Sequence, residues 1–237
     1  MSAEYPADDT VLPDKLRASV AASMALEKLA RRFQVEMLVL NDLDTGLLTN
    51  VGLRPGFTPL PGTDDVMVVP EGDIGAGLAC YLLNKLSGQP VNFIEPFYIN
   101  YNDNTFTAGH AGPQDYTAPG SKTRISRDTR FAKTGYKHAG APFTWNVIVP
   151  GEKTMVHVSQ DKNSFKIAVA VVDALECEHF LAGYSHGILK PRIPATEFFG
   201  KLIDFGVTQH YGLTDGNWAA EIAAFAGLMG FACLELF

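Results

Sequence analysis

The sequence predicts a mixed α/β protein, in which a partial Rossmann-like α/β layer (1–90) precedes a β-barrel-like C-terminal domain (91–237) closed by two helices. Two observations lead to this prediction. Up to residue 90, helical patterns alternate with short apolar strands, which is typical of a parallel α/β layer. After residue 90, strand patterns joined by polar turns dominate, and helical patterns return only near the end.

The first part predicts two helices and two strands. Apolar residues recur at three- and four-residue steps in the first helix, and the second helix stops at Ser87-Gly88. Ligands of parallel layers bind at the carboxyl ends of the strands, so the second strand end is of interest. The predicted elements are a helix (14–33), a strand (35–42), a Gly/Pro-rich loop (45–65), a strand (65–70) and a helix (74–86).

The second part predicts a barrel or an antiparallel meander that ends in two helices. Polar turns such as NDN, PGEK and QDKN separate its strand patterns. In order, we expect strands within 90–110, a loop-rich stretch (112–145), three strands within 145–176, a helix (195–205), a strand (207–211), a helix (215–229) and a strand (231–236).

The composition indicates a globular protein, with 46% hydrophobic and 19% charged residues in 237. A net charge of −7 makes nucleic acid an unfavourable partner. Cys80, Cys177 and Cys233 show no CxxC spacing, which favours reduced thiols and a cytoplasmic location. The polar start is unlike a signal peptide. The apolar tail carries Glu221 and Glu235, so we expect a packed helix and strand and no membrane span.

Three groups of side chains could carry chemistry. Glu71 and Asp73 lie where the second strand turns into a helix. Glu95 lies inside an otherwise apolar strand, where a carboxylate requires a cation or a hydrogen-bond network. His110 is expected at a strand end, and His210 falls between two predicted helices. Together these oxygen and nitrogen donors suit a divalent ion such as Mn2+.

Each group also has a purely structural interpretation. Glu71 or Asp73 could cap the helix that begins at residue 74. Glu95 could face solvent, because Pro96 is typical of an edge strand. A histidine at a strand end is more often structural than a ligand. We interpret the remaining histidines as structural: His138, His157, His179 and His186.

Known short motifs of other enzyme classes are missing from the sequence. It contains no HExxH and no P-loop, and GDIGAG lacks the glycine spacing of a dinucleotide fingerprint. GYSHG (183–187) matches the letters GxSxG, but no strand is expected directly before it and no helix directly after it, so a nucleophile elbow is not predicted. A zinc protease, a P-loop nucleotidase and a serine hydrolase are therefore not supported.

The ordered segments EGDIGAGLACYLLNKLSGQPVNFIEPFY, TFTAGHAGP and GVTQHYGLTDGNWAAEIAAFAGLMGFACLEL resemble the second half of the L-fucose/L-arabinose isomerase family. The preceding helix and strand resemble its middle domain, so the similarity runs from about residue 14 to the end. It implies a Mn2+-dependent (or other divalent-cation-dependent) isomerase that interconverts an aldose and a ketose through an ene-diol.

The resemblance also implies roles for single residues. Two carboxylates would act as base and acid, and a cation would stabilise the ene-diolate charge. The implied catalytic residues are Glu71 and Glu95, the implied metal ligands are Glu71, Glu95, His110 and His210, and the implied substrate contacts are Gln209 and Asp73.

The sequence departs from the family in two ways. Gln209-His210 stands where the family usually has two histidines, so one imidazole is replaced by an amide. Family enzymes also carry an N-terminal domain that this sequence lacks. The resemblance therefore implies a natural short form, one part of a split enzyme, or a fragment. We expect a homo-oligomer or a partner chain that supplies the N-terminal region. The alternatives are a non-catalytic metal- or sugar-binding subunit and a sugar epimerase.

Overall fold

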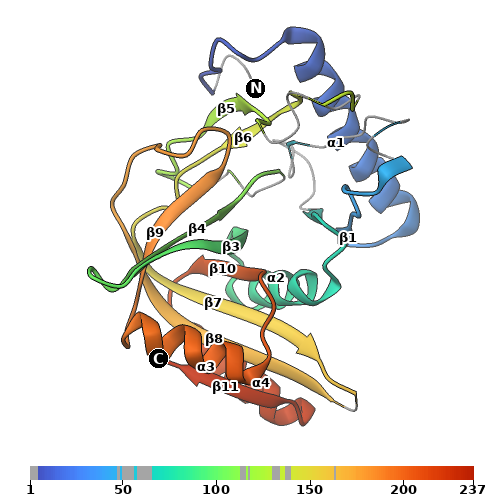
Figure 1. The fold of residues 1–237 in the computed structure, drawn as a ribbon. Helices are drawn as coiled ribbons and strands as arrows, with labels where there is room; N and C mark the ends of the chain where they lie inside the picture. Colours follow the sequence, from blue (N-terminus) through green and yellow to red (C-terminus); the bar gives the residue numbers. More distant parts are fainter. Residues whose placement is uncertain are drawn as a thin grey trace. The chain divides into compact units, whose positions relative to one another are not determined.

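The computed structural model describes residues 5–46, 49, 56–57, 66–112, 116, 118–129, 134–136, 140–162 and 164–237. Its backbone divides into two compact units that alternate along the chain (Figure 1). Unit 1 takes residues 1–73, 110–147 and 178–185, and unit 2 takes residues 74–109, 148–177 and 186–237.

Strands of unit 2 form a closed barrel (Figure 1). Neighbouring strands follow the order β8-β7-β10-β3-β4-β9, and β9 pairs with β8 to close the ring. A further strand, β11 (Ala232–Leu236), pairs with β8 in parallel. The barrel strands are β3 (Val91–Asn100), β4 (Thr105–His110), β7 (Gly151–Gln160), β8 (Phe165–Leu175), β9 (Ser185–Pro191) and β10 (Tyr211–Asp215).

One apolar core stabilises unit 2. Helix α3 (Ala195–Phe205) contributes Phe198 and Leu202, which share a face because they are four residues apart. Full burial of such side chains is worth roughly 1.5–3 kcal/mol each. From the strands, the same core takes Ile94, Phe106, Met155, Val172, Leu189 and Leu213.

Two further helices pack on the strands of unit 2. Helix α2 (Ile74–Ser87) contacts β3, β7 and β10, and helix α4 (Ala219–Met229) contacts β8 and β11. Gly212 of β10 lies directly against α2, since a Cβ atom there would lie 3.1 Å from the Cys80 backbone nitrogen. The glycine therefore sets how closely the helix approaches the sheet.

Unit 1 combines a long helix with two small sheets. Helix α1 (Pro13–Phe33) contacts β1 (Met37–Val39), which pairs in parallel with β2 (Met67–Val69). The helix also contacts β6 (Pro142–Trp145), the antiparallel partner of β5 (Arg124–Arg127). The buried Ser19 hydroxyl donates a 2.8 Å hydrogen bond to the Pro142 carbonyl oxygen and links helix and sheet.

The structure confirms a mixed α/β protein with a barrel and several predicted elements within it. Helices predicted over 14–33, 74–86 and 195–205 are found as α1, α2 and α3 with ends displaced by at most one residue. The strand predicted over 231–236 is β11. A Rossmann-like layer stays a prediction, because the first part shows a single parallel strand pair among its described residues.

The strand predicted over 207–211 is wrong. The strand in this region is β10, which begins at Tyr211. Before it, the Thr208 amide and the His210 carbonyl bind the side chain of His157 and not a neighbouring strand. Hydrogen bonds to the His157 side chain thus stand where hydrogen bonds to the backbone of a neighbouring strand were expected, within 207–211.

The last helix starts later than predicted over 215–229. Gly216 adopts a left-handed conformation (φ 84°), which is incompatible with a right-handed helix through this position. The Trp218 amide then donates to the Thr154 hydroxyl at 2.8 Å, and the helix begins at Ala219.

The stretch 112–176 also differs from the prediction. Its loop-rich part contains β5 and β6, and the first of three expected strands is not continuous. The Val147 amide donates to the Ser121 carbonyl, whereas the Ile148 amide donates to the His186 carbonyl. The backbone changes partner at successive residues, so no long strand forms there. Strand β9 was not predicted, and the loop predicted over 45–65 lies mostly outside the described residues.

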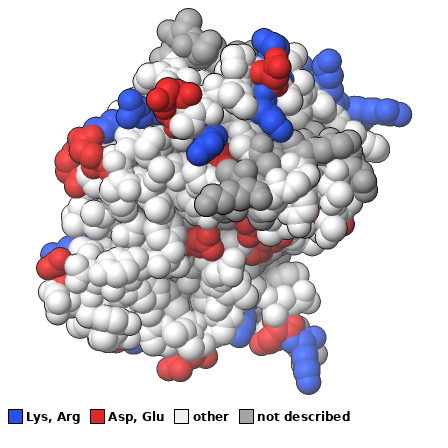
Figure 2. Space-filling view, turned by 45° about the horizontal axis from the view of Figure 1, so that its top comes forward, with Lys and Arg blue, Asp and Glu red and all other residues white. Residues whose placement is uncertain are grey.

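The predicted domain boundary after residue 90 stays a prediction. The two compact units alternate along the chain, so neither corresponds to one continuous stretch before or after residue 90. None of the described helices is both long and apolar enough to cross a membrane. On the face shown in Figure 2, described Lys and Arg side chains stand in separate groups among acidic and uncharged ones.

Candidate functional site

Glu71 lies in a strained turn that joins β2 to α2. Glu71 (φ 63°) and Gly72 (φ 70°) are both left-handed, and a left-handed glutamate persists only where its surroundings hold it. The Glu71 amide donates a 2.7 Å hydrogen bond to Asp42 Oδ1, and the Gly72 amide donates to the Leu40 carbonyl at 3.0 Å. The turn is therefore fixed by the chain that follows β1.

Asp42 supports this turn from the segment after β1, and the sequence analysis did not identify it. Its side chain is buried, with 1% exposure, and accepts the Glu71 amide. The signal was present, because Asp42 ends the apolar run of the first predicted strand. Parallel pairing of β1 with β2 brings their carboxyl ends to the same edge, which places Asp42 beside Glu71.

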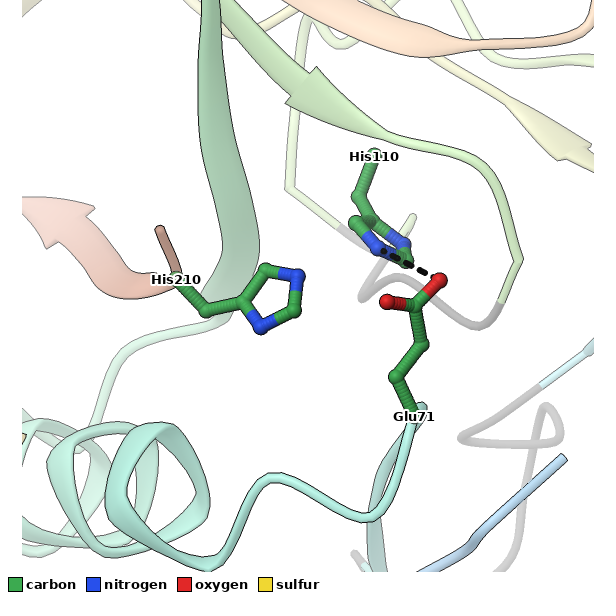
Figure 3. A group of neighbouring side chains, drawn as sticks. All are labelled: Glu71, His110 and His210. Carbon is green, nitrogen blue, oxygen red and sulfur yellow. Dashed lines mark ion pairs between the residues drawn. The ribbon is translucent and has the colours of Figure 1, made fainter. Parts of the chain in front are cut away.

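The carboxylate of Glu71 lies beside His110. Glu71 Oε1 is 3.4 Å from His110 Nε2 (Figure 3). The His110 side chain is 1% exposed and that of Glu71 is 15% exposed. Both residues fall within the ranges of unit 1, and His110 is the last residue of β4, as predicted. A buried imidazole and a largely buried carboxylate thus form one polar pair.

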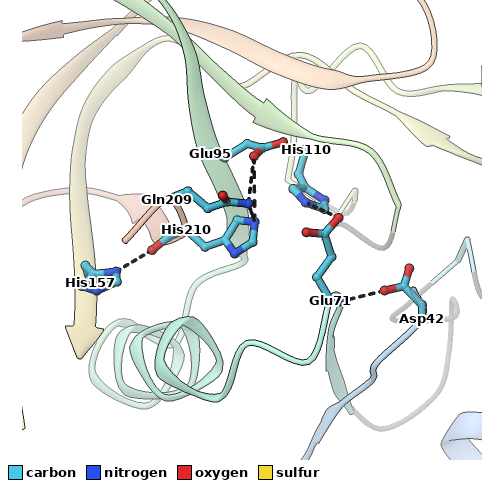
Figure 4. A network of polar contacts seen from close by, with 7 residues as sticks. All are labelled: Asp42, Glu71, Glu95, His110, His157, Gln209 and His210. Atoms are coloured by element: carbon cyan, nitrogen blue, oxygen red, sulfur yellow. Dashed lines mark hydrogen bonds and ion pairs between the residues drawn. The ribbon is translucent and has the colours of Figure 1, made fainter. Parts of the chain in front are cut away.

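A second carboxylate–imidazole pair lies in unit 2 (Figure 4). Glu95 Oε2 is 3.9 Å from His210 Nε2. The Gln209 side-chain amide donates to Glu95 Oε2 at 3.4 Å and lies 3.0 Å from His210 Nε2. Because an amide nitrogen only donates, His210 Nε2 is the acceptor of this contact, and its lone pair is directed at the Gln209 amide.

Strand β3, which carries Glu95, is not an edge strand. It pairs with β10 on one side and β4 on the other, so the interpretation of Pro96 as an edge signal is wrong. The β3–β4 register shifts between Pro96 and Tyr98, and this bulge accommodates the missing proline N–H. Glu95 therefore projects from the middle of the sheet.

Strand pairing in unit 2 brings Glu95 beside the segment that carries His210. Ile94 of β3 pairs with Tyr211 of β10, the residue that follows His210. Glu95 itself pairs with Gly109 of β4 on the other side. Glu95 and His210 are thus close in space although they lie far apart in the sequence.

The structure also shows where the other residues named in the sequence analysis lie. Asp73 directly precedes α2 and is half-buried. His179 Nε2 lies 3.1 Å from the Trp145 carbonyl, and His186 is buried in β9, while His138 lies outside the described residues. His157, which we interpreted as only structural, binds the backbone of the segment that carries His210.

One titratable group beside the second pair has a perturbed pKa. Burial raises the pKa of the Tyr211 phenol above its ordinary value of 10.0. The phenol is therefore held neutral in the folded protein well into the alkaline range.

The sequence matches no model of a known protein family and no curated protein. The resemblance to sugar isomerases therefore stays a hypothesis that rests on the residues themselves.

Proposed function

We propose that the protein is a divalent-metal-dependent aldose–ketose isomerase of the L-fucose/L-arabinose isomerase type. The observation that carries the proposal is the presence of two carboxylate–imidazole pairs, Glu71 with His110 and Glu95 with His210. The Glu71 carboxylate is largely buried beside His110, where a lone charge would be unfavourable, and a cation would compensate it.

The donor set fits a divalent cation such as Mn2+. Carboxylate oxygens and neutral imidazole nitrogens suit hard to borderline ions, and His210 Nε2 lies 3.9 Å from Glu95 Oε2. We propose that Glu71, Glu95, His110 and His210 hold the ion. When bound, it would stabilise the negative charge of an ene-diolate.

The two glutamates can exchange the protons that the isomerisation requires. One carboxylate removes the proton from C2 of the aldose while the carbonyl oxygen on C1 gains a proton, which gives the ene-diol. The hydroxyl proton on C2 then leaves and a proton is added to C1, which gives the ketose without net gain or loss of atoms. Gln209 and Asp73 are proposed to bind substrate hydroxyls.

The test is incubation of the full chain with Mn2+ and a panel of pentoses and 6-deoxyhexoses in D2O, followed by NMR. We expect ketose with deuterium at C1, loss of turnover with EDTA and recovery with Mn2+. Glu95→Gln should abolish turnover, whereas Glu221→Gln, at an exposed position of α4, should leave it unchanged. An aldose with deuterium at an inverted C2 would indicate an epimerase.

A second candidate is a non-catalytic metal- or sugar-binding subunit that needs a partner chain. Exposed apolar side chains on α1 favour it, namely Met24, Leu29 and Phe33, since such groups are often covered by another protein. Mn2+ binding that Glu95→Ala removes, without turnover on any sugar, would support this candidate. Absence of both binding and turnover would refute the metal centre.

A further inference from the structure

His157 binds the backbone of the segment that carries His210. Its Nδ1 lies 2.7 Å from the His210 carbonyl oxygen (Figure 4). Its Nε2 accepts the Thr208 amide at 3.4 Å. A carbonyl oxygen requires a donor and an amide requires an acceptor, so both contacts are satisfied by one neutral tautomer with the proton on Nδ1. The imidazole therefore binds the backbone at two places, the Thr208 amide and the His210 carbonyl.

The contact begins where strand pairing ends. Gly212 and Val156 are the last residue pair of the β7–β10 ladder on this side, and His157 follows Val156 in β7. Beyond this pair, the His157 side chain takes over the hydrogen bonds that backbone groups of β7 would make in a longer ladder. The His157 ring also packs on Tyr211, with 5.5 Å between ring centroids.

The burial of His157 makes this contact specific. The residue is 1% exposed, so its polar atoms have little access to water and need partners within the protein. The backbone of Thr208 and His210 supplies both. Movement of this segment would leave a buried imidazole without its hydrogen bonds, which is unfavourable.

We propose that His157 is a positioning residue that fixes the backbone at His210 and so aims the His210 imidazole at Glu95. The inference rests on the proposed metal centre, in which His210 is a ligand. With the His210 carbonyl bound, the direction of its Cα–Cβ bond is set, and Nε2 is held 3.9 Å from Glu95 Oε2. Removal of a group that orients a metal ligand typically lowers the metal affinity about 10–100-fold.

The experiment compares three variants of the full chain by Mn2+ titration calorimetry and by NMR without metal. His157→Leu removes both hydrogen bonds, and His157→Asn keeps a donor near the position of Nδ1. Val156→Ala is the control, because it removes buried volume from the same strand without touching the 208–210 backbone.

We expect His157→Leu to weaken Mn2+ binding about tenfold or more, and His157→Asn to recover most of the loss. Val156→Ala should lower thermal stability and leave Mn2+ affinity unchanged. Equal Mn2+ affinity of His157→Leu and the wild type would overturn the inference. So would an equal loss in Val156→Ala, because general loosening of the barrel would then explain the effect.

The NMR measurement separates this inference from the proposed function. In the metal-free wild type, the nitrogen shifts of His157 should show the neutral tautomer protonated on Nδ1, and hydrogen exchange at the Thr208 amide should accelerate in His157→Leu but not in Val156→Ala. If the wild type binds no Mn2+ and these signals still appear, the metal centre fails and the positioning of 208–210 stands. If the tautomer or the exchange pattern differs, the positioning fails as well.

Discussion

Replacement of Glu71 by glycine should leave unit 1 more stable than replacement by alanine. Both changes remove the carboxylate, so they differ only in the Cβ atom at a position where φ is 63°. The Asp42 carboxylate, which accepts the residue 71 amide, holds the backbone in this conformation in both variants. The comparison therefore isolates the strain of the left-handed turn.

The magnitude follows from two opposing effects. A left-handed residue that carries a Cβ costs about 1–2 kcal/mol. Glycine loses more chain entropy on folding, which offsets roughly 0.5–1 kcal/mol of that gain. The free energy of unfolding of the glycine variant should therefore be about 0.7 kcal/mol higher than that of the alanine variant. With an m-value of about 2 kcal/mol/M, its urea midpoint should be higher by roughly 0.4 M.

The two tryptophans allow this unfolding to be followed at one place in the chain. Trp145 lies in unit 1 and Trp218 in unit 2, so fluorescence in a Trp218→Phe background reports on unit 1. Glu36 offers the matched control, because it lies in unit 1 outside the left-handed positions, and there alanine should be the more stable replacement. If the alanine variant of Glu71 equals or exceeds the glycine variant, residue 71 is not held left-handed in solution.

Two further predictions concern the surroundings of the site. Asp42→Ala should lower the unfolding free energy of unit 1 by about 2 kcal/mol, because the Glu71 amide loses a buried charged acceptor. Asp42→Asn keeps an acceptor oxygen and should lose about half as much, and equal urea midpoints of the two variants would contradict this role. Tyr211 makes stability depend on pH: burial raises the pKa of its phenol in the folded state above 10.0, so only the unfolded chain ionises just above pH 10. The Tyr211 contribution to stability should therefore be constant well below pH 10 and fall through it, with a slope that grows to about 1.4 kcal/mol per pH unit once the unfolded phenol is fully ionised. Urea unfolding followed at Trp218 between pH 9 and 11 should show this slope in the wild type and not in Tyr211→Phe, and parallel curves would refute it.

Periodicity predicted the helices well and the irregular strands poorly. Helix α3 was predicted over its full length because Phe198 and Leu202 repeat at helical spacing and Gly206 ends the pattern. Strand β10 was misplaced, because the strand was predicted over 207–211 and is found at Tyr211–Asp215. Its glycine is required by close contact with α2, where a Cβ atom at Gly212 would approach Cys80 within 3.1 Å. Such a requirement depends on the neighbouring helix and leaves no local pattern.

The same distinction applies to the site. Glu71, Glu95, His110 and His210 were singled out because charged or imidazole groups at strand ends or inside apolar runs are unusual. The structure brings them together as two pairs. His157 was missed because a histidine in an alternating strand carries no local sign of its long-range partner, the backbone before β10.

The position of β10 in the barrel has a consequence for synthesis on the ribosome. It lies between β7 and β3 in the sheet, yet every other barrel strand precedes it in the chain. Until it is inserted, the nascent protein presents two unpaired strand edges, which are prone to associate with other chains. His210 immediately precedes β10, so the proposed metal ligands are complete only when these edges are closed. A chain terminated before residue 207 would therefore lack the proposed ligand His210 and tend to aggregate for the same structural reason.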